Sequence, residues 1–246
     1  MDQRLEFALE TCLRAGKATL RWFQNDPQVR LKDDGSVVTQ ADLAAEDIVR
    51  EAVLKHFPQD GIYGEERGRT GEGPGRWVVD PIDGTQSFVA GVPLYSTLLS
   101  YEIDKTAVIG VCYFPALDET LYAEVGKGAF YQGKPAKVAN PVPIESAVVS
   151  TGSLKSMARI GLLEGAGAMA EQCRTLRTWS DAHGHALVAT GRAHAMLDPN
   201  VADWDVSAIQ VIVREAGGWF GELAGPGTAL SVVPAMREEV LGVLDV

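Results

Sequence analysis

The chain has 246 residues, of which 46% are apolar and 22% charged, and its formal net charge is −11 at pH 7. This composition is typical of a globular protein with one large domain or two small ones. The sequence lacks an apolar run of about 18 residues, which excludes a transmembrane helix, and the negative charge argues against nucleic acid as the main ligand.

The N-terminal quarter predicts two helices. Residues 3–23 carry apolar side chains near helical spacing, which is typical of an amphipathic helix. Thr39 and Asp42 match a capping box, so a second helix is expected to begin there and to end at residue 57. A glycine-rich loop is expected over residues 68–75.

The chain then changes to short β-prone runs that are separated by hairpin-type turns. The expected strands are 96–103, 107–114, 120–125 and 129–138. They predict an antiparallel meander, which forms an α+β half together with the two N-terminal helices.

The segment Asn140-Pro141-Val142-Pro143 predicts a boundary between a half made of residues 1–140 and a half made of residues 141–246. Beyond it, apolar runs alternate with helical ones, which indicates a mixed, partly parallel sheet with crossover helices. The expected strands are 147–150, 174–179, 194–197 and 219–223, and the expected helices are 156–172, 183–190 and 205–216.

The most informative stretch is Asp80-Pro81-Ile82-Asp83-Gly84-Thr85, which follows an apolar run. Pro81 fixes φ and has no N–H, so the strand is expected to end in a turn there. Gly84 permits close approach of a ligand, and a helix that begins after it would present free N–H groups to an anion. Two carboxylates beside a phosphate need cations between them, as in a two-metal phosphatase. The alternative is an ordinary turn with solvated aspartates.

Two further acidic positions lie where a strand is expected to end or a helix to begin: Glu65-Glu66 and Trp204-Asp205. Side chains at such positions can converge on one site. Asp205 has an alternative as a helix-capping or first-turn acid, and Asp42 has one in the capping box itself.

These acidic positions, in this order, closely resemble the magnesium-dependent inositol monophosphatase superfamily, from Lys32 to Gly218. The resemblance implies a layered α-β-α-β-α sandwich, the fold type shared with fructose-bisphosphatase, with an antiparallel sheet in the first half and a mixed sheet in the second. The first half would carry most of the metal ligands. The second would carry the last ligand and the residues that set substrate specificity.

The resemblance also implies a phosphomonoesterase that uses metal-activated water and two or three Mg²⁺ ions per active site. Asp80 would bridge two metals. The implied metal ligands are Glu65, Asp80, the carbonyl of Ile82, Asp83 and Asp205. Oxygen ligands of this kind suit magnesium.

The implied catalytic residues are Thr85 and Asp42, which would orient the attacking water, and Glu66, which would lie behind the ligands. Because metal coordination lowers the pKa of water, the protein need only hold and aim it. Lys32 either reaches the phosphate or the metal cluster, or is a solvated surface lysine.

The run from residue 177 to 193 is similar to the histidinol-phosphatase branch, in which an aspartate at the position of Asp181 faces the amino group of the substrate. The implied substrate-binding residues are Gly84, Thr85, Trp179, Ser180, Asp181 and Asp198. Two histidines, His183 and His185, stand where aromatic residues are expected. They either form a partly buried helix face or contact the substrate directly.

We therefore expect hydrolysis of L-histidinol phosphate to L-histidinol, a step of histidine biosynthesis. The alternatives are an inositol-1-monophosphatase, a broad sugar phosphatase, or a protein-binding scaffold of the same fold, which the complete ligand set disfavours. A homodimer without nucleic-acid or membrane partners is expected. Three scattered cysteines and an N-terminus without an apolar signal-peptide core indicate the cytoplasm.

Overall fold

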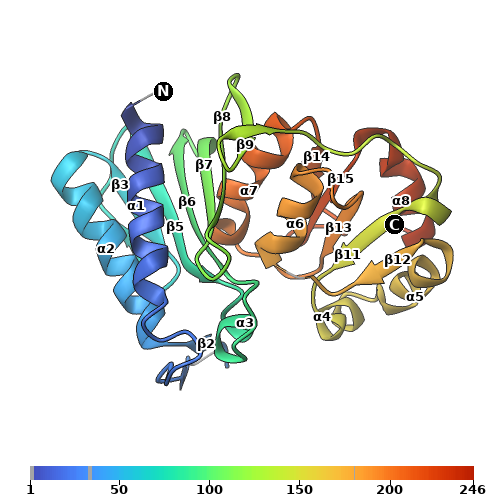
Figure 1. The fold of residues 1–246 in the computed structure, drawn as a ribbon, viewed down its shortest axis with the longest axis horizontal. Helices are drawn as coiled ribbons and strands as arrows, with labels where there is room; N and C mark the ends of the chain where they lie inside the picture. Colours follow the sequence, from blue (N-terminus) through green and yellow to red (C-terminus); the bar gives the residue numbers. More distant parts are fainter. Residues whose placement is uncertain (1–2, 33–34, 180) are drawn as a thin grey trace.

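The computed structural model describes residues 3–32, 35–179 and 181–246, and its elements form five alternating layers (Figure 1). The layers are helices α1 (Gln3–Thr19) and α2 (Gln40–His56), an eight-stranded sheet, helices α6 (Asp181–Ala189) and α7 (Asp203–Glu215), a five-stranded sheet, and helices α4 (Leu154–Arg159), α5 (Leu163–Gln172) and α8 (Arg237–Leu244). The predicted α-β-α-β-α sandwich is confirmed.

The outer helices α1 and α2 bury their apolar faces against the first sheet. Leu5, Ala8 and Cys12 of α1 are buried there, as the periodicity predicts. The first helix ends at Thr19, four residues before the predicted end, and turns follow it. The second begins as predicted, because Thr39 and Asp42 form the capping box.

The first sheet has the strand order β10-β9-β8-β7-β6-β5-β3-β4. Its strands are β3 (Gly61–Gly64), β4 (Gly68–Thr70), β5 (Gly75–Asp83), β6 (Ser96–Ile103), β7 (Thr106–Phe114), β8 (Glu119–Glu124), β9 (Gly128–Tyr131) and β10 (Lys134–Ala136). The predicted antiparallel meander is correct from β6 to β10, and β5 pairs antiparallel with β6 at its edge. Two expectations are wrong: β4 occupies part of the predicted loop, and the run 129–138 is a hairpin of two strands.

Strand β5 does not end in a turn at Pro81, as the sequence led us to expect, but continues to Asp83. Its register against β6 shifts between Asp80 and Asp83, which is a bulge. A bulge accommodates a proline because the missing N–H falls outside the regular hydrogen-bond ladder. Gly84 then adopts φ 80° and the short helix α3 (Thr85–Val89) follows.

The second sheet is mixed, as predicted, with the order β12-β11-β13-β15-β14. Its strands are β11 (Val148–Thr151), β12 (Thr175–Arg177), β13 (Ala195–Asp198), β14 (Trp219–Gly221) and β15 (Ala229–Val232). The single helix predicted over 156–172 is instead two, α4 and α5, separated at Gly161 with φ 78°. Helix α8 was not predicted.

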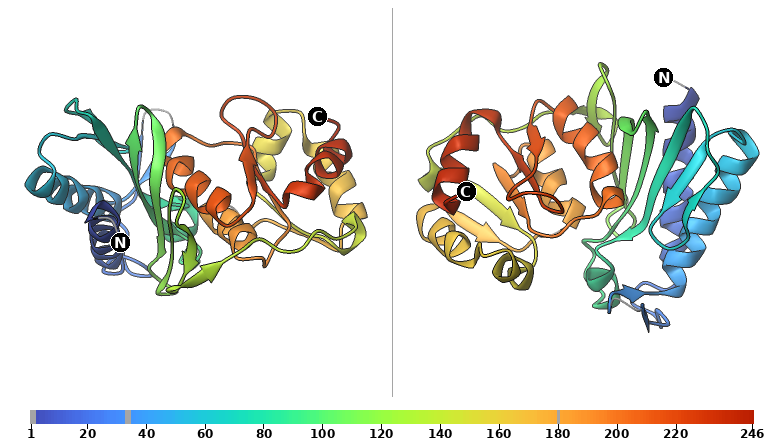
Figure 2. Two further views of the ribbon diagram at one scale, coloured as in Figure 1. Left: turned by 90° about the horizontal axis from the view of Figure 1, so that it is seen from above. Right: turned by 180° about the vertical axis from the view of Figure 1, so that it is seen from behind.

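Helices α6 and α7 lie between the two sheets (Figure 2). Residues of both helices share one hydrophobic cluster with strands β6 to β10, so the second half of the chain packs closely on the first. The domain division at residue 140 stays a prediction.

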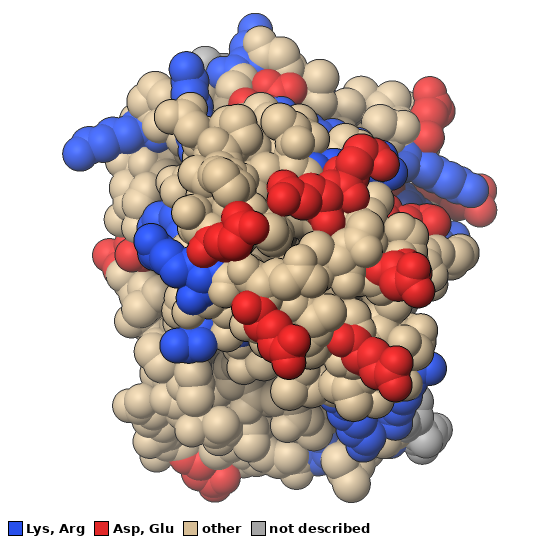
Figure 3. Space-filling view, turned by 90° about the vertical axis from the view of Figure 1, so that its right-hand side faces the viewer, with Lys and Arg blue, Asp and Glu red and all other residues tan. Residues whose placement is uncertain are grey.

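Three short segments complete the described chain: the hairpin of β1 (Arg30–Leu31) and β2 (Val37–Val38), and two 3-10 turns, η1 (Ile144–Ser146) and η2 (Pro234–Met236). Acidic and basic side chains are interspersed on the outer face formed by α4, α5 and α8 (Figure 3). Within the described ranges, no helix combines the length and the apolar character that crossing a membrane requires.

Candidate active site

The fold brings the predicted acidic positions together at one edge of the first sheet. Strands β3 and β5 are parallel neighbours, so Glu65 after β3 lies beside the end of β5. Asp205, in the first turn of α7, reaches the same point from the second half of the chain. Single carboxylate oxygens of Asp80, Asp83 and Asp205 lie within 4.8 Å of one another.

These carboxylates line a cavity of about 220 Å³. Its lining residues are Ser36, Val37, Glu65, Asp80, Ile82, Asp83, Gly84, Thr85, Gln86, Asp181, Asn200 and Asp205. Sequence reasoning missed four of them: Ser36, Val37, Gln86 and Asn200. Only Asn200 gives a usable signal, because it follows a strand of a partly parallel sheet, where ligands commonly bind.

Burial and mutual repulsion raise the pKa of the clustered carboxyl groups. Asp80 and Asp83 are 1% and 5% exposed. Desolvation, reinforced by neighbouring acids, raises the pKa of both well above the usual range. Burial likewise raises the pKa of Asp205 to about 7. Carboxylates that repel one another in this way fit a site for hard cations, because a cation would allow all of them to ionise.

Each clustered aspartate is also held by the protein. Asp80 Oδ1 accepts a 3.1 Å hydrogen bond from the backbone N–H of Ile82. Asp83 Oδ2 accepts from the Ser96 hydroxyl at 3.1 Å and from the backbone N–H of Ala182 at 2.9 Å. Because Ala182 belongs to α6, Asp83 links the two halves of the chain.

Asp205 combines the two roles that the sequence left open. Its Oδ2 accepts a 2.8 Å hydrogen bond from the backbone N–H of Ala202, so it does cap α7. Its carboxylate nevertheless lies in the cluster with Asp80 and Asp83. The hydrogen bond that caps α7 therefore also holds the Asp205 carboxylate in place beside Asp80 and Asp83.

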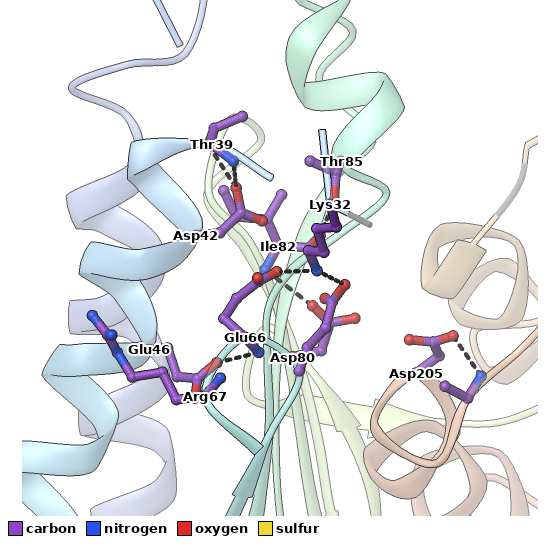
Figure 4. Close-up of polar contacts among 12 residues, drawn as sticks. Lys32, Thr39, Asp42, Glu46, Glu66, Arg67, Asp80, Ile82, Thr85 and Asp205 are labelled. Carbon is purple, nitrogen blue, oxygen red and sulfur yellow. Dashed lines mark hydrogen bonds and ion pairs between the residues drawn. The ribbon is translucent and has the colours of Figure 1, made fainter. Parts of the chain in front are cut away.

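Lys32 is not a solvated surface lysine. Its Nζ donates to Glu65 Oε1 at 2.8 Å and to Glu66 Oε1 at 2.7 Å (Figure 4). Burial still raises the pKa of Glu66 to about 7, although the Lys32 hydrogen bond opposes this shift. The lysine thus supplies a positive charge at the acidic end of the site.

The two carboxylate oxygens of Asp42 have different surroundings: one accepts hydrogen bonds in the cap of α2, and the other does not take part in the cap. Oδ2 accepts from the backbone N–H of Thr39 at 2.8 Å and from its hydroxyl at 2.6 Å. Oδ1 is buried and has no hydrogen-bond partner among the described residues. Burial raises the pKa of Asp42 to about 6. The Thr85 hydroxyl donates to Ile82 O at 3.1 Å and not to Asp42, so these two predicted catalytic residues do not pair directly.

Among the predicted substrate residues, Asp181 lies in the cavity. Its carboxylate oxygen is 2.9 Å from the position that a Cβ atom on Gly84 would occupy. A side chain at residue 84 would collide with it and would also strain a backbone at φ 80°. The backbone conformation therefore favours glycine at this position, and the nearby carboxylate adds to that preference.

Gly84 and Thr85, which were also predicted to bind substrate, line the same cavity, whereas Trp179 and Asp198 do not. Trp179 packs on a hydrophobic cluster with Leu187 and Met196 and does not line the cavity described above. Asp198 is 7% exposed, and its Oδ2 lies 3.5 Å from His185 Nε2. Ser180 lies outside the described residues.

Both histidines of α6 are buried in the protein interior. His183 contacts the Phe114 ring edge-on, and burial lowers its pKa to about 4. His185 Nδ1 and the Ser231 hydroxyl are 2.6 Å apart. These contacts favour the buried helix face over direct substrate contact.

Comparison with known proteins agrees with this geometry. A sequence model described as the inositol monophosphatase family matches residues 1–240. A histidinol-phosphatase from Chlorobaculum parvum is 39% identical over 220 residues, which are 89% of this chain and 85% of that protein. An inositol-1-monophosphatase from Mesorhizobium japonicum is 35% identical over 233 residues, 90% of this chain and 86% of the other. The solved structure of an IMPase from Thermotoga maritima superposes with a TM-score of 0.90 at 30% identity, covering 100% of this chain and 97% of that one.

Proposed function

The chain belongs to the inositol monophosphatase family, and from this premise we propose that it is a magnesium-dependent phosphomonoesterase that converts L-histidinol phosphate to L-histidinol. The convergence of Glu65, Asp80, Asp83 and Asp205 on one cavity supports the phosphatase activity. The carboxylate of Asp181 in the same cavity supports a substrate that carries an amine. Relatives named histidinol-phosphatase agree with this choice.

The residues present fit a site for two or three magnesium ions. Glu65, Asp80 and the carbonyl of Ile82 would hold the first, and Asp80, Asp83 and Asp205 the second. All of these donors are hard oxygens, which magnesium prefers. When bound, the ions would neutralise the phosphate charge and make water a better nucleophile at neutral pH.

The protein's own residues would position the water and the ester. Asp42 Oδ1, buried and without a protein partner among the described residues, is suited to accept a hydrogen from the attacking water. The Thr85 hydroxyl, which donates to Ile82 O, would help to orient the same water. The backbone N–H groups of Gly84 and Thr85 would donate to the phosphate.

Substrate choice would depend on Asp181 and Asp198. A carboxylate that the ligand desolvates is favourable when the ligand supplies an ammonium group, and costly when the ligand is a neutral polyol. An amino alcohol phosphate therefore suits this cavity better than inositol phosphate. Relatives named inositol-1-monophosphatase support that activity as the second candidate.

The test is a phosphate-release assay with magnesium across histidinol phosphate, inositol phosphates, sugar phosphates and nucleotide phosphates. We expect the highest kcat/KM for histidinol phosphate and no activity after chelation. Preference for inositol phosphate would reject the substrate. Full activity after chelation would reject the metal-dependent mechanism.

We also propose a cytoplasmic homodimer. Cys12, Cys112 and Cys173 are buried free thiols, which suits a reducing compartment. Light scattering of the purified protein would measure the oligomeric state, and a monomer at micromolar concentration would contradict the dimer.

A further inference from the structure

Glu46 is a charged residue that the proposed reaction does not use, yet it is fully buried, with 0% exposure. It lies on α2 four residues after Asp42, so both side chains project from the same face of the helix. A buried carboxylate is costly unless several donors compensate it. The groups that donate hydrogen bonds to Glu46 therefore show which part of the chain this carboxylate keeps in place.

Two of its donors are backbone N–H groups of the turn after β3. Glu46 Oε2 accepts from the N–H of Glu66 at 2.8 Å, and Oε1 accepts from the N–H of Arg67 at 3.2 Å. Figure 4 shows Glu46 pointing from α2 toward this turn. Two backbone N–H groups of the turn therefore donate to a side chain of the helix that also presents Asp42.

The remaining charge is balanced by Arg50, one turn further along α2. Arg50 Nε donates to Glu46 Oε1 at 2.7 Å. The same guanidinium donates to the Thr70 hydroxyl at 2.9 Å and to Gly68 O. The Glu46–Arg50 pair thus makes hydrogen bonds both with the β3–β4 turn and with strand β4 that follows it.

Gly64 gives independent evidence for this arrangement. A Cβ atom at residue 64 would lie 2.3 Å from Glu46 Oε1. The carboxylate therefore packs directly on the backbone just before Glu65, while it binds the N–H just after Glu65. Residue 65 is fixed from both sides.

We propose that Glu46 is a positioning residue, which orients Glu65 toward the cation site by holding the backbone on either side of it. The inference rests on the proposed function, in which Glu65 is a metal ligand. The salt bridge from Lys32 alone cannot set this direction, because it holds the end of a flexible side chain. The backbone contacts to Glu46 set where that side chain starts.

The test is Mn²⁺ binding to the purified full chain, measured by electron paramagnetic resonance and by calorimetry. Glu46→Gln keeps the shape but presents an amide NH₂ to a donor that needs an acceptor. We expect it to weaken Mn²⁺ binding about 10- to 100-fold, the usual effect of removing a partner that orients a ligand. At saturating metal, kcat should change much less than the metal affinity.

Asp47→Asn is the matched control. Asp47 binds the Arg67 side chain at 2.6 and 2.7 Å on the exposed side of the same turn, without touching its backbone. We expect its Mn²⁺ affinity to stay within about twofold of the wild type, since exposed ion pairs contribute little. An equal loss in both variants would overturn the inference.

Gly64→Ala is a second route to the same result. It keeps both charged side chains, Glu46 and Arg50, but pushes a methyl group against the carboxylate, so it decides the question if Glu46→Gln does not fold. Wild-type Mn²⁺ affinity in a folded Glu46→Gln or Gly64→Ala protein would overturn the inference, even if its melting temperature fell. Asp80→Asn separates the two proposals: undiminished Mn²⁺ binding there would reject the metal site itself.

Discussion

Asp181 allows a residue-level test of substrate choice. Its φ is 61°, which asparagine tolerates better than alanine, so Asp181→Asn removes the charge with little backbone strain. A charge-assisted hydrogen bond is worth roughly 1.5–3 kcal/mol. We expect kcat/KM for histidinol phosphate to fall about ten- to a hundredfold, at about 1.4 kcal/mol per tenfold change.

Inositol phosphate is the control substrate for Asp181→Asn. It carries no cation, so its hydrolysis should be unchanged or improved when the negative charge in the cavity is removed. Steady-state kinetics on both substrates measure the difference. Equal losses on both would mean that the variant has a folding or metal-binding defect, and the assignment of Asp181 to an amine would be wrong.

The buried His183 should make the stability of the folded protein fall as the pH is lowered. Its pKa of about 4 in the folded protein lies below the value of about 6.5 in an unfolded chain. Stability from neutral His183 is therefore fully present above pH 6.5 and is lost as pH falls toward 4. Between pH 6.5 and 5 this residue should cost about 2 kcal/mol of the free energy of unfolding.

His183→Phe should remove that part of the pH dependence, because Phe114 offers an aromatic neighbour to the new ring. The charged groups that act on His183 are Arg192 and Glu119, and both remain in the variant. Urea unfolding at pH 6.5 and pH 5 measures the change. The same pH dependence in both proteins would contradict this explanation.

Individual residues show what sequence reasoning can and cannot supply. The carboxylates of the site could be identified because their types and order are distinctive. The pairing of Lys32 with Glu65 and Glu66 could not, because a lysine in a polar segment carries no sign of its partners. The closeness of the Asp181 carboxylate to Gly84 could not be predicted either, because the two residues lie in segments that meet only in the folded chain.

At the level of elements, the docking of α7 on the first sheet determines where Asp205 lies. A Cβ atom on Gly110 of β7 would lie 2.2 Å from Ala208 O, so the helix and strand backbones are in direct contact. Beside this contact, the Ser207 hydroxyl bonds Glu102 and the Ser100 hydroxyl, each at 2.6 Å. These contacts hold α7 against the sheet that carries Asp80 and Asp83.

Gly110→Ala should therefore displace α7. We expect a loss of about 1–3 kcal/mol in the free energy of unfolding, which is typical of overpacking. The magnesium concentration needed for half-maximal activity should rise as well, because Asp205 moves with the helix. Gly126→Ala is a control, since a Cβ atom there meets nothing within 4 Å, although its φ of 77° costs some backbone strain. If the magnesium dependence of Gly110→Ala is unchanged, the docking of α7 on β7 does not determine the position of Asp205 in the site.

The elements themselves were predictable where local rules dominate. The capping box fixed the start of α2, and the alternation of apolar runs and turns indicated the meander. Interruptions within helices and strands were less predictable from the sequence. Gly161 divides a helix, and the bulge at Pro81 lets β5 continue, because tertiary hydrogen bonds outweigh the local preference for a turn.

At the scale of the whole molecule, the layered fold followed from the family resemblance and not from the periodicity of any segment. The mixed second sheet could be expected from alternating strands and helices, but its strand order could not. That order places β13 beside β15, which are joined by a long excursion through α7 and β14. Only long-range packing decides such an arrangement.

The proposed metal ligands are divided between the first sheet and α7, and this division has a kinetic consequence. Asp80 and Asp205 are far apart in the sequence, so the complete site forms only after α7 has docked. Interactions that form after the transition state for folding slow unfolding and leave refolding nearly unchanged. We expect magnesium to lower the unfolding rate constant in stopped-flow experiments, tenfold for each ~1.4 kcal/mol by which it stabilises the folded protein at the concentration used, with little change in the refolding rate. In Asp205→Asn most of this effect should vanish, whereas equal acceleration of refolding would mean that the site assembles early.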